Sequence, residues 1–91
     1  MNEKVISEFY EKEIDVAWSK TQSEEKKIYI IEVMAYALDE REHEKIRAFI
    51  EQHNGRFTRI DSDSIFAVFE YDDYKDAVKM LKELEQEGWK W

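Results

Sequence analysis

One segment constrains the fold more than any other stretch of this chain. Residues 27–38, KIYIIEVMAYAL, are apolar almost throughout and rich in Ile, Val and Tyr. Such a run is typical of a β-strand that is covered on both faces. Asp39 and Glu42 follow with the spacing of a capping box, in which Asp takes the place of Ser or Thr. The sequence therefore predicts a core strand that leads directly into a helix.

The residues after this strand predict a helix and then a β-hairpin. The helix has a buried stripe over residues 46–53, which includes Ile46, Phe49 and Ile50, and it ends at Asn54-Gly55. Two short strands follow at residues 56–61 and 64–71, because both runs are rich in β-branched and aromatic residues. The polar residues 61–64 form the turn between them.

The C-terminal part predicts a second helix. It opens at Asp72 or Asp73 and ends at Gly88, and residues 89–91 predict a short final strand. Each glycine of the chain follows a helix, so we expect Gly55 and Gly88 to adopt the left-handed conformation that ends helices.

The N-terminal segment predicts an amphipathic helix. Between residues 3 and 19, apolar residues recur at spacings of about four and one. They are Val5, Ile6, Phe9, Tyr10, Ile14, Ala17 and Trp18. A strand through residues 14–18 is the alternative, but it needs Glu11 and Glu13 on the same face. We predict a helix over residues 1–20 and a polar connection over residues 21–27.

These elements together predict a single domain of the α+β class over residues 1–91. From residue 28 onward the order is βαββα, with a short final strand, and the helix of residues 1–20 is an addition. This order resembles the ferredoxin-like split βαβ plan, in which a right-handed crossover makes the first two strands parallel. The plan hosts many unrelated functions, so the resemblance extends to the fold alone.

The sheet of this plan has its helices on one face, which leaves the second face to be explained. Both faces are apolar in sequence, and we expect the second to carry Ile30 together with Met34, Tyr36, Phe57, Ile65 and Phe69. Apolar patches of that size usually mark a contact. The N-terminal helix could cover the face, or two chains could pair through it as a homodimer. A base-stacking surface would need a basic aromatic motif, and SIFAVFEY has no Lys, Arg or Gly.

No pattern in the sequence indicates catalysis, so we expect a non-enzymatic protein without cofactor or metal. A phosphate loop, a nucleophile elbow and metal-binding motifs are all absent. His43 and His53 have simpler roles on or at the end of a helix, and Asp72, Asp73 and Asp76 suit the start of one. With no Cys, no signal peptide and no membrane-length apolar run, the expected location is the cytoplasm.

The charge of the chain indicates the kind of partner. The net charge is −8, so direct nucleic-acid binding is disfavoured and a basic protein is the better partner. The first helix should begin at the same end of the sheet as the hairpin turn. That end would gather Asp39, Glu40, Glu42, Glu44, Asp61 and Asp63, with Arg41 and Lys45 opposing them.

These features favour a protein-binding module that inhibits a nucleic-acid-binding protein by imitating DNA. Trp89 and Trp91 would supply further contacts. In size and charge alone, the chain is similar to anti-CRISPR and anti-restriction proteins of viruses and mobile elements, and it would then act in the host cytoplasm. The alternative is a homodimeric regulatory or structural domain that pairs through the second face of its sheet.

Overall fold

The computed structural model describes residues 3–17 and 19–91. The described part of the chain forms four strands and two helices, with no helix long and apolar enough to cross a membrane. The elements are β1 (Glu3–Ala17), β2 (Ser23–Tyr36), α1 (Glu40–Gln52), β3 (Arg56–Ile60), β4 (Ser64–Tyr71) and α2 (Tyr74–Gln86).

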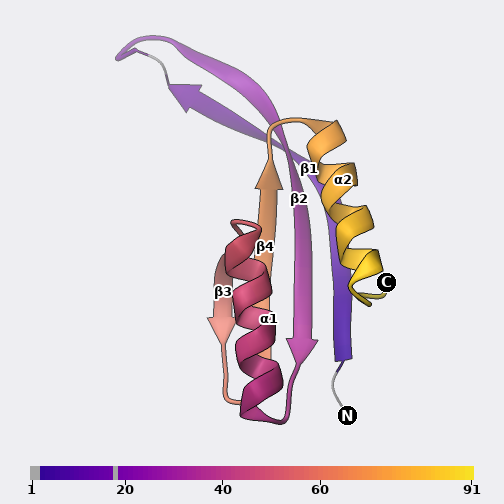
Figure 1. The fold of residues 1–91 in the computed structure, drawn as a ribbon. Helices are drawn as coiled ribbons and strands as arrows, with labels where there is room; N and C mark the ends of the chain where they lie inside the picture. Colours follow the sequence, from indigo (N-terminus) through magenta and orange to yellow (C-terminus); the bar gives the residue numbers. More distant parts are fainter. Residues whose placement is uncertain (1–2, 18) are drawn as a thin grey trace.

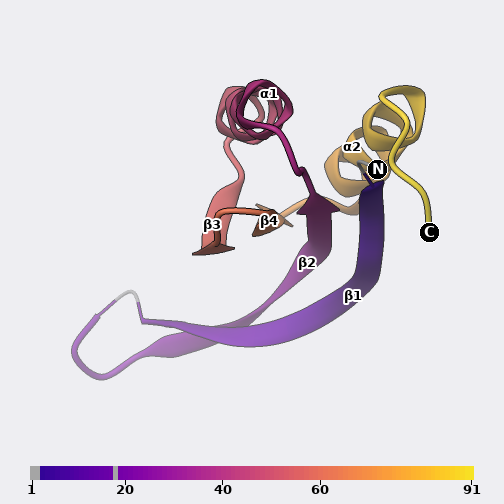
Figure 2. The same ribbon diagram turned by 90° about the horizontal axis from the view of Figure 1, so that it is seen from below.

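The strands form one antiparallel sheet in the order β1-β2-β4-β3, and both helices lie on the same face of it (Figures 1 and 2). The α+β class predicted from the sequence is therefore confirmed. β2 and β3 run in the same direction, because each is antiparallel to β4 between them.

The prediction of an N-terminal helix was wrong. Residues 3–17 form the edge strand β1, which pairs with β2 from Glu3↔Tyr36 to Ala17↔Ser23. The predicted connection is wrong as well, since β2 already begins at Ser23. Trp18 lies outside the described residues.

A β-bulge at Ser7 explains the error. The register shifts between Ile6 and Glu8, so that Ile6 and Phe9 both face the helices although they are three residues apart. A bulge of this kind breaks the alternation of a strand. The resulting spacing of apolar pairs, Val5-Ile6 and Phe9-Tyr10, imitates the period of a helix.

The core lies between the helices and one face of the sheet. β2 contributes Ile31, Val33 and Ala35, which are almost completely buried. The other members of this core are Ile6, Ala37, Ile46, Ile50, Ile65, Ala67, Phe69, Met80, Leu81, Leu84 and Trp89. The burial of Phe69 and Ile65 follows from the register, which pairs them with Ile31 and Ala35.

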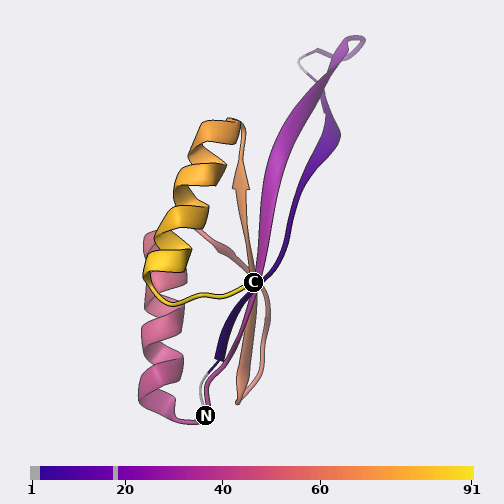
Figure 3. The same ribbon diagram turned by 90° about the vertical axis from the view of Figure 1, so that its right-hand side faces the viewer.

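The opposite face of the sheet, here called the open face, has no layer of structure over it among the described residues (Figure 3). Alternation along the paired strands assigns its members. They are Glu3, Val5, Glu8, Tyr10, Lys12, Ile14 and Val16 of β1, Glu24, Lys26, Ile28, Ile30, Glu32, Met34 and Tyr36 of β2, Ser64, Phe66, Val68 and Glu70 of β4, and Arg56 and Arg59 of β3.

This assignment corrects the expected composition of the second face. Met34 and Tyr36 belong to the open face, as expected, whereas Phe57, Ile65 and Phe69 face the helices and pack in the core. A second bulge, at Thr58, puts Phe57 and Arg59 on opposite faces. Simple alternation through β3 placed them on the same face.

Both helices start as the sequence predicts, at aspartate N-caps. The Asp39 carboxylate accepts a hydrogen bond of 2.7 Å from the backbone N–H of Glu42, and Asp73 accepts one of 2.9 Å from Lys75.

The ends of the helices differ from each other. Gly88 adopts the left-handed φ of 93° as expected, but after α1 Asn54 takes this role, with a φ of 60°. Gly55 is required for space, because a Cβ there would lie 2.6 Å from Ile50 and 2.7 Å from Phe69.

The predicted final strand is reduced to a single bridge between Val5 and Lys90. The backbone N–H of Ile6 donates to the Lys90 carbonyl at 2.7 Å, and the N–H of Lys90 donates to the Lys4 carbonyl at 3.0 Å. The C-terminal residues therefore cover part of the outer edge of β1.

Candidate functional site

The β1–β2 hairpin extends well beyond the rest of the sheet (Figure 1). β4 pairs only with residues 29–36 of β2, whereas β1 and β2 continue to pair as far as Ala17↔Ser23. Residues 12–17 and 23–28 therefore form a two-stranded projection, here called the arm. Six residues per strand correspond to a length of about 20 Å. An isolated two-stranded hairpin of this kind is only marginally stable in water.

The arm bends away from the helices, so its inner side continues the open face (Figures 2 and 3). Ile28, Ile30 and Val68 form a second buried cluster there, with Tyr10 and Ile14 packed against it. Farther out, Val16 is 39% exposed, and Tyr36 at the opposite end of the open face is 41% exposed. A strip of apolar residues therefore runs along β1 and β2 from Tyr36 to Val16. It is interrupted by the charged residues Glu8, Glu32, Lys12, Lys26 and Glu24.

Two carboxylates face each other in the middle of this strip. Glu8 and Glu32 are direct cross-strand partners, and no ion pair with a described cation neutralises either of them. A hydrogen bond with Glu8, burial and the Glu8 charge raise the pKa of the Glu32 carboxyl above its usual value. Like charges directly opposite in a sheet are destabilising, so this site favours a proton or an added cation.

The predicted acidic end is a second candidate. The backbone N–H of Ala37 donates to the Asp63 carbonyl at 2.9 Å, and His43 Nε2 lies 2.9 Å from the carbonyl oxygen of Asp61. These bonds hold the start of α1 against the β3–β4 turn, so Asp39, Glu40, Glu42, Glu44, Asp61 and Asp63 lie at one end of the molecule (Figure 1).

Two of these acids already have structural roles. Asp39 caps α1, and Asp61 accepts hydrogen bonds from Arg59 Nε at 2.8 Å and from the Ser64 hydroxyl at 3.2 Å. Glu40, Glu44 and Asp63 are exposed, and they form no ion pair with a described residue.

The two tryptophans named as contact residues have different positions. Trp89 is only 3% exposed and packs against Phe49, with ring centroids 6.3 Å apart. Its burial removes it from the candidate partner contacts. Trp91 is 64% exposed.

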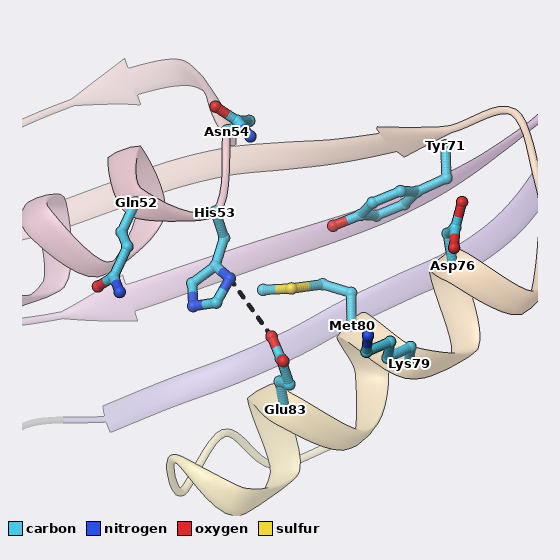
Figure 4. A pocket seen from close by; sticks show the side chains of 8 residues that line it. All are labelled: Gln52, His53, Asn54, Tyr71, Asp76, Lys79, Met80 and Glu83. Atoms are coloured by element: carbon cyan, nitrogen blue, oxygen red, sulfur yellow. Dashed lines mark ion pairs between the residues drawn. The ribbon is translucent and has the colours of Figure 1, made fainter.

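A cavity of about 300 Å³ lies between the end of α1 and the middle of α2 (Figure 4). His53 Nδ1 and Glu83 Oε2 approach to 3.3 Å beside it. Burial, followed by the charges of Glu83 and Asp76, raises the pKa of Tyr71 to about 12. Tyr71 therefore stays protonated at neutral pH.

The aspartates at the start of α2 have ordinary roles. Asp73 is the N-cap and Asp72 pairs with Lys26 at 3.1 Å. Residues 3–17 and 19–91 contain no group of three or more His, Cys, Asp or Glu side chains placed to hold a metal ion.

Sequence reasoning missed the arm and the Glu8–Glu32 pair. The signal was present, because acids alternate strictly with other residues from Tyr10 to Val16. Glu11 and Glu13 argued against a strand because a strand puts both of them on the same face, and β1 does so. Both are exposed in the structure.

Comparisons with protein-family models, with curated proteins and with solved structures found no match.

Proposed function

We propose that this chain is a non-enzymatic protein-binding module whose acidic end occupies the basic nucleic-acid-binding site of a partner protein. The observation that carries the proposal is the junction between α1 and the β3–β4 turn. Two contacts to backbone carbonyl oxygens, one from the Ala37 N–H to Asp63 and one from the His43 side chain to Asp61, gather carboxylates from two distant segments at one end of the sheet.

Glu40, Glu44 and Asp63 are the residues best placed to contact the partner. They are exposed, and none of the three is needed to cap a helix or to neutralise Arg59. Asp39, Glu42 and Asp61 add further negative charge at the same end of the molecule. The exposed Trp91 offers an additional aromatic contact.

The mechanism is steric and electrostatic. Carboxylates on a rigid end can take the places that phosphate oxygens occupy in a basic groove, since Arg and Lys pair with both groups. The opposite charges accelerate the encounter, and the complex weakens as salt screens them. An inhibitor of the anti-CRISPR or anti-restriction type, encoded by a virus or mobile element and active in the host cytoplasm, would act in this way.

The sheet itself supports a ferredoxin-like plan with a changed strand order along the chain. Two observations support this proposed plan. The series β2-α1-β3-β4-α2 has the βαββα order expected for it, and β1 pairs with the outer side of β2, where a last strand would be expected. This fold assignment leaves the functional proposal unchanged.

The test is competition with DNA. Proteins of a host lysate that are retained on heparin serve as candidate partners. This chain is then used to capture its partner from that pool, and the captured protein is identified by its mass. We expect a short DNA duplex to displace it from the chain, and the triple variant Glu40→Gln, Glu44→Gln, Asp63→Asn to lose at least about tenfold in affinity, since each lost charge pair is worth up to about 1 kcal/mol.

A matched control removes the same number of charges elsewhere. Glu13 and Glu25 on the arm and Glu51 near the end of α1 are exposed and lie away from the acidic end, so their change to Gln should leave the affinity almost intact. Equal losses in both triple variants, or simultaneous binding of DNA and this chain to the captured protein, would disprove the mimicry.

A further inference from the structure

We infer that the open face is an interface between two copies of this chain, in which each arm lies over the Tyr36 end of the other copy's sheet. This pairing is independent of the acidic end.

Exposed apolar residues at opposite ends of the strip make it complementary to itself. Val16 lies on the arm and Tyr36 lies at the far end of β2, and both are among the few large apolar side chains that are well exposed in the described chain. An antiparallel two-fold arrangement brings the arm of one copy to the far end of the other. Such a symmetric contact uses the same patch twice and closes as a dimer.

The register of β1 and β2 shows which of their cross-strand pairs, here called rows, would meet in the dimer. The two-fold axis passes across the Tyr10↔Ile30 row, which lies halfway between the Val16↔Glu24 row and the end of β2. The Ile14↔Lys26 row then lies against the Val5↔Met34 row, and the Val16↔Glu24 row lies against the Glu3↔Tyr36 row. Val16 and Tyr36 are thus brought into facing rows on neighbouring strands, where each shields part of the other from water.

The same register places opposite charges together. The Lys12↔Ile28 row of one copy faces the Glu8↔Glu32 row of the other. Lys12 is exposed and forms no ion pair within the described chain, and the two glutamates have no cation of their own. The second copy therefore supplies the charge that this site requires.

The area of the contact fits a weak dimer. In this arrangement β1 and β2 of the two copies overlap along residues 24–36 of β2, whereas most of β3 and β4 stays uncovered. Two strands at about 4.8 Å spacing over that length cover roughly 400 Å² on each copy. Together the copies bury about 800 Å², the size of a weak or transient interface. The arm bends toward the open side of the sheet, so it can reach over the end of the other copy (Figure 3).

The test is the molecular mass of the full chain over a concentration series of about 1–100 μM, the range in which interfaces of modest area are measured. The chain alone has a mass of 11.1 kDa, and we expect twice this mass at the upper end. Val16→Glu and Tyr36→Glu should each weaken the dimer at least tenfold while the circular dichroism spectrum stays unchanged. Ile60→Glu is the matched control, because Ile60 is 48% exposed on the helix side of β3, and it should remain dimeric.

Charge exchange tests the arrangement itself. Lys12→Glu alone and the double variant Glu8→Lys, Glu32→Gln alone should both be monomeric, because each creates like-charge contacts across the two-fold axis. Mixed together they should form a heterodimer, detected by native mass spectrometry, since both contacts are then attractive. A wild-type chain that stays monomeric throughout, or a dimer that survives both Val16→Glu and Tyr36→Glu, would overturn the inference.

Discussion

At the scale of single residues, the Glu8–Glu32 pair is an unfavourable contact within the sheet. The two carboxylates are opposed across β1 and β2, and the hydrogen bond with Glu8 that raises the pKa of Glu32 requires a shared proton. A carboxyl whose pKa is higher in the folded chain than in the unfolded chain stabilises the fold while it is protonated. This contribution is lost as the pH rises through the folded pKa.

Replacing Glu32 by Gln should therefore stabilise the monomer at neutral pH. The neutral amide keeps the hydrogen bond and removes the repulsion, which is worth about 0.5 kcal/mol for a solvent-screened cross-strand pair. Urea denaturation of both proteins, each carrying Tyr36→Glu to prevent pairing, measures the difference. The advantage of the variant should be largest at pH 7 and should disappear near pH 4, where the native carboxyl is protonated. A constant advantage at all pH values would mean that packing, rather than charge, is responsible.

Two single residues also explain where sequence reasoning failed. The bulges at Ser7 and Thr58 each shift a strand by one residue, so that Ile6 and Phe9, and likewise Phe57 and Ile60, share a face at a spacing of three. That spacing belongs to helices, and no local signal distinguishes it from a bulged strand. By contrast, Asp39 and Asp73 predicted the helix starts correctly, because a cap depends on neighbouring residues alone.

At the scale of elements, the C-terminal segment secures β1 to the helix layer. Trp89 inserts into the core beside Phe49, and Lys4 Nζ lies 5.9 Å from its ring centroid. Lys4 also donates to the carbonyl of Glu87 at the end of α2, at 2.6 Å. The sequence suggested that Trp89 and Trp91 were both exposed contact residues. A segment of three residues is too short for its pattern to show which ring is buried and which is exposed.

Trp89→Ala should cost about 3–5 kcal/mol of unfolding free energy, the usual range for removing a large buried aromatic side chain. Trp91→Ala should change it by less than about 0.5 kcal/mol, since Trp91 is mostly exposed. Chemical denaturation of the two variants provides the comparison. Similar effects of both substitutions would contradict the placement of Trp89 in the core.

The candidate sites were only partly predictable from the sequence. The acidic end followed from the order of the elements, because a strand, a helix and a hairpin of this plan leave few positions for Asp39 and Asp61. The arm could not be predicted from the sequence. The distance by which β1 extends beyond β4 depends on the relative lengths of strands that pair from distant segments. The sequence predicted that the sheet has a second apolar face. Which residues lie on that face depends on the strand register, which sequence patterns do not encode.

At the scale of the whole molecule, the arm changes the overall shape. The Cα radius of gyration is 15.0 Å and the longest extent is 51 Å. A compact domain of this length has a radius of gyration of about 12 Å. The difference is consistent with a globular body that carries a projection.

Shortening the arm should leave that body intact. Glu13 and Lys27 are cross-strand partners, so residues 14–26 can be replaced by Asn-Gly, which forms a tight hairpin turn. In the Tyr36→Glu background, which keeps both proteins monomeric, small-angle scattering should show the radius of gyration falling to about 12 Å. Loss of cooperative melting in the shortened chain would instead show that the globular body needs the arm to fold.

The bridge between Lys90 and β1 has a consequence for solubility. An edge strand with free amide and carbonyl groups can recruit strands from other chains and start an aggregate. At the opposite edge, β3 is short, bulged and carries two arginines, which discourages such growth. On the β1 side, the hydrogen bonds of Lys90 to Lys4 and Ile6 occupy the edge next to the hydrophobic core. A few residues at the end of the chain thus keep the most apolar part of this edge from serving as a template for fibrils.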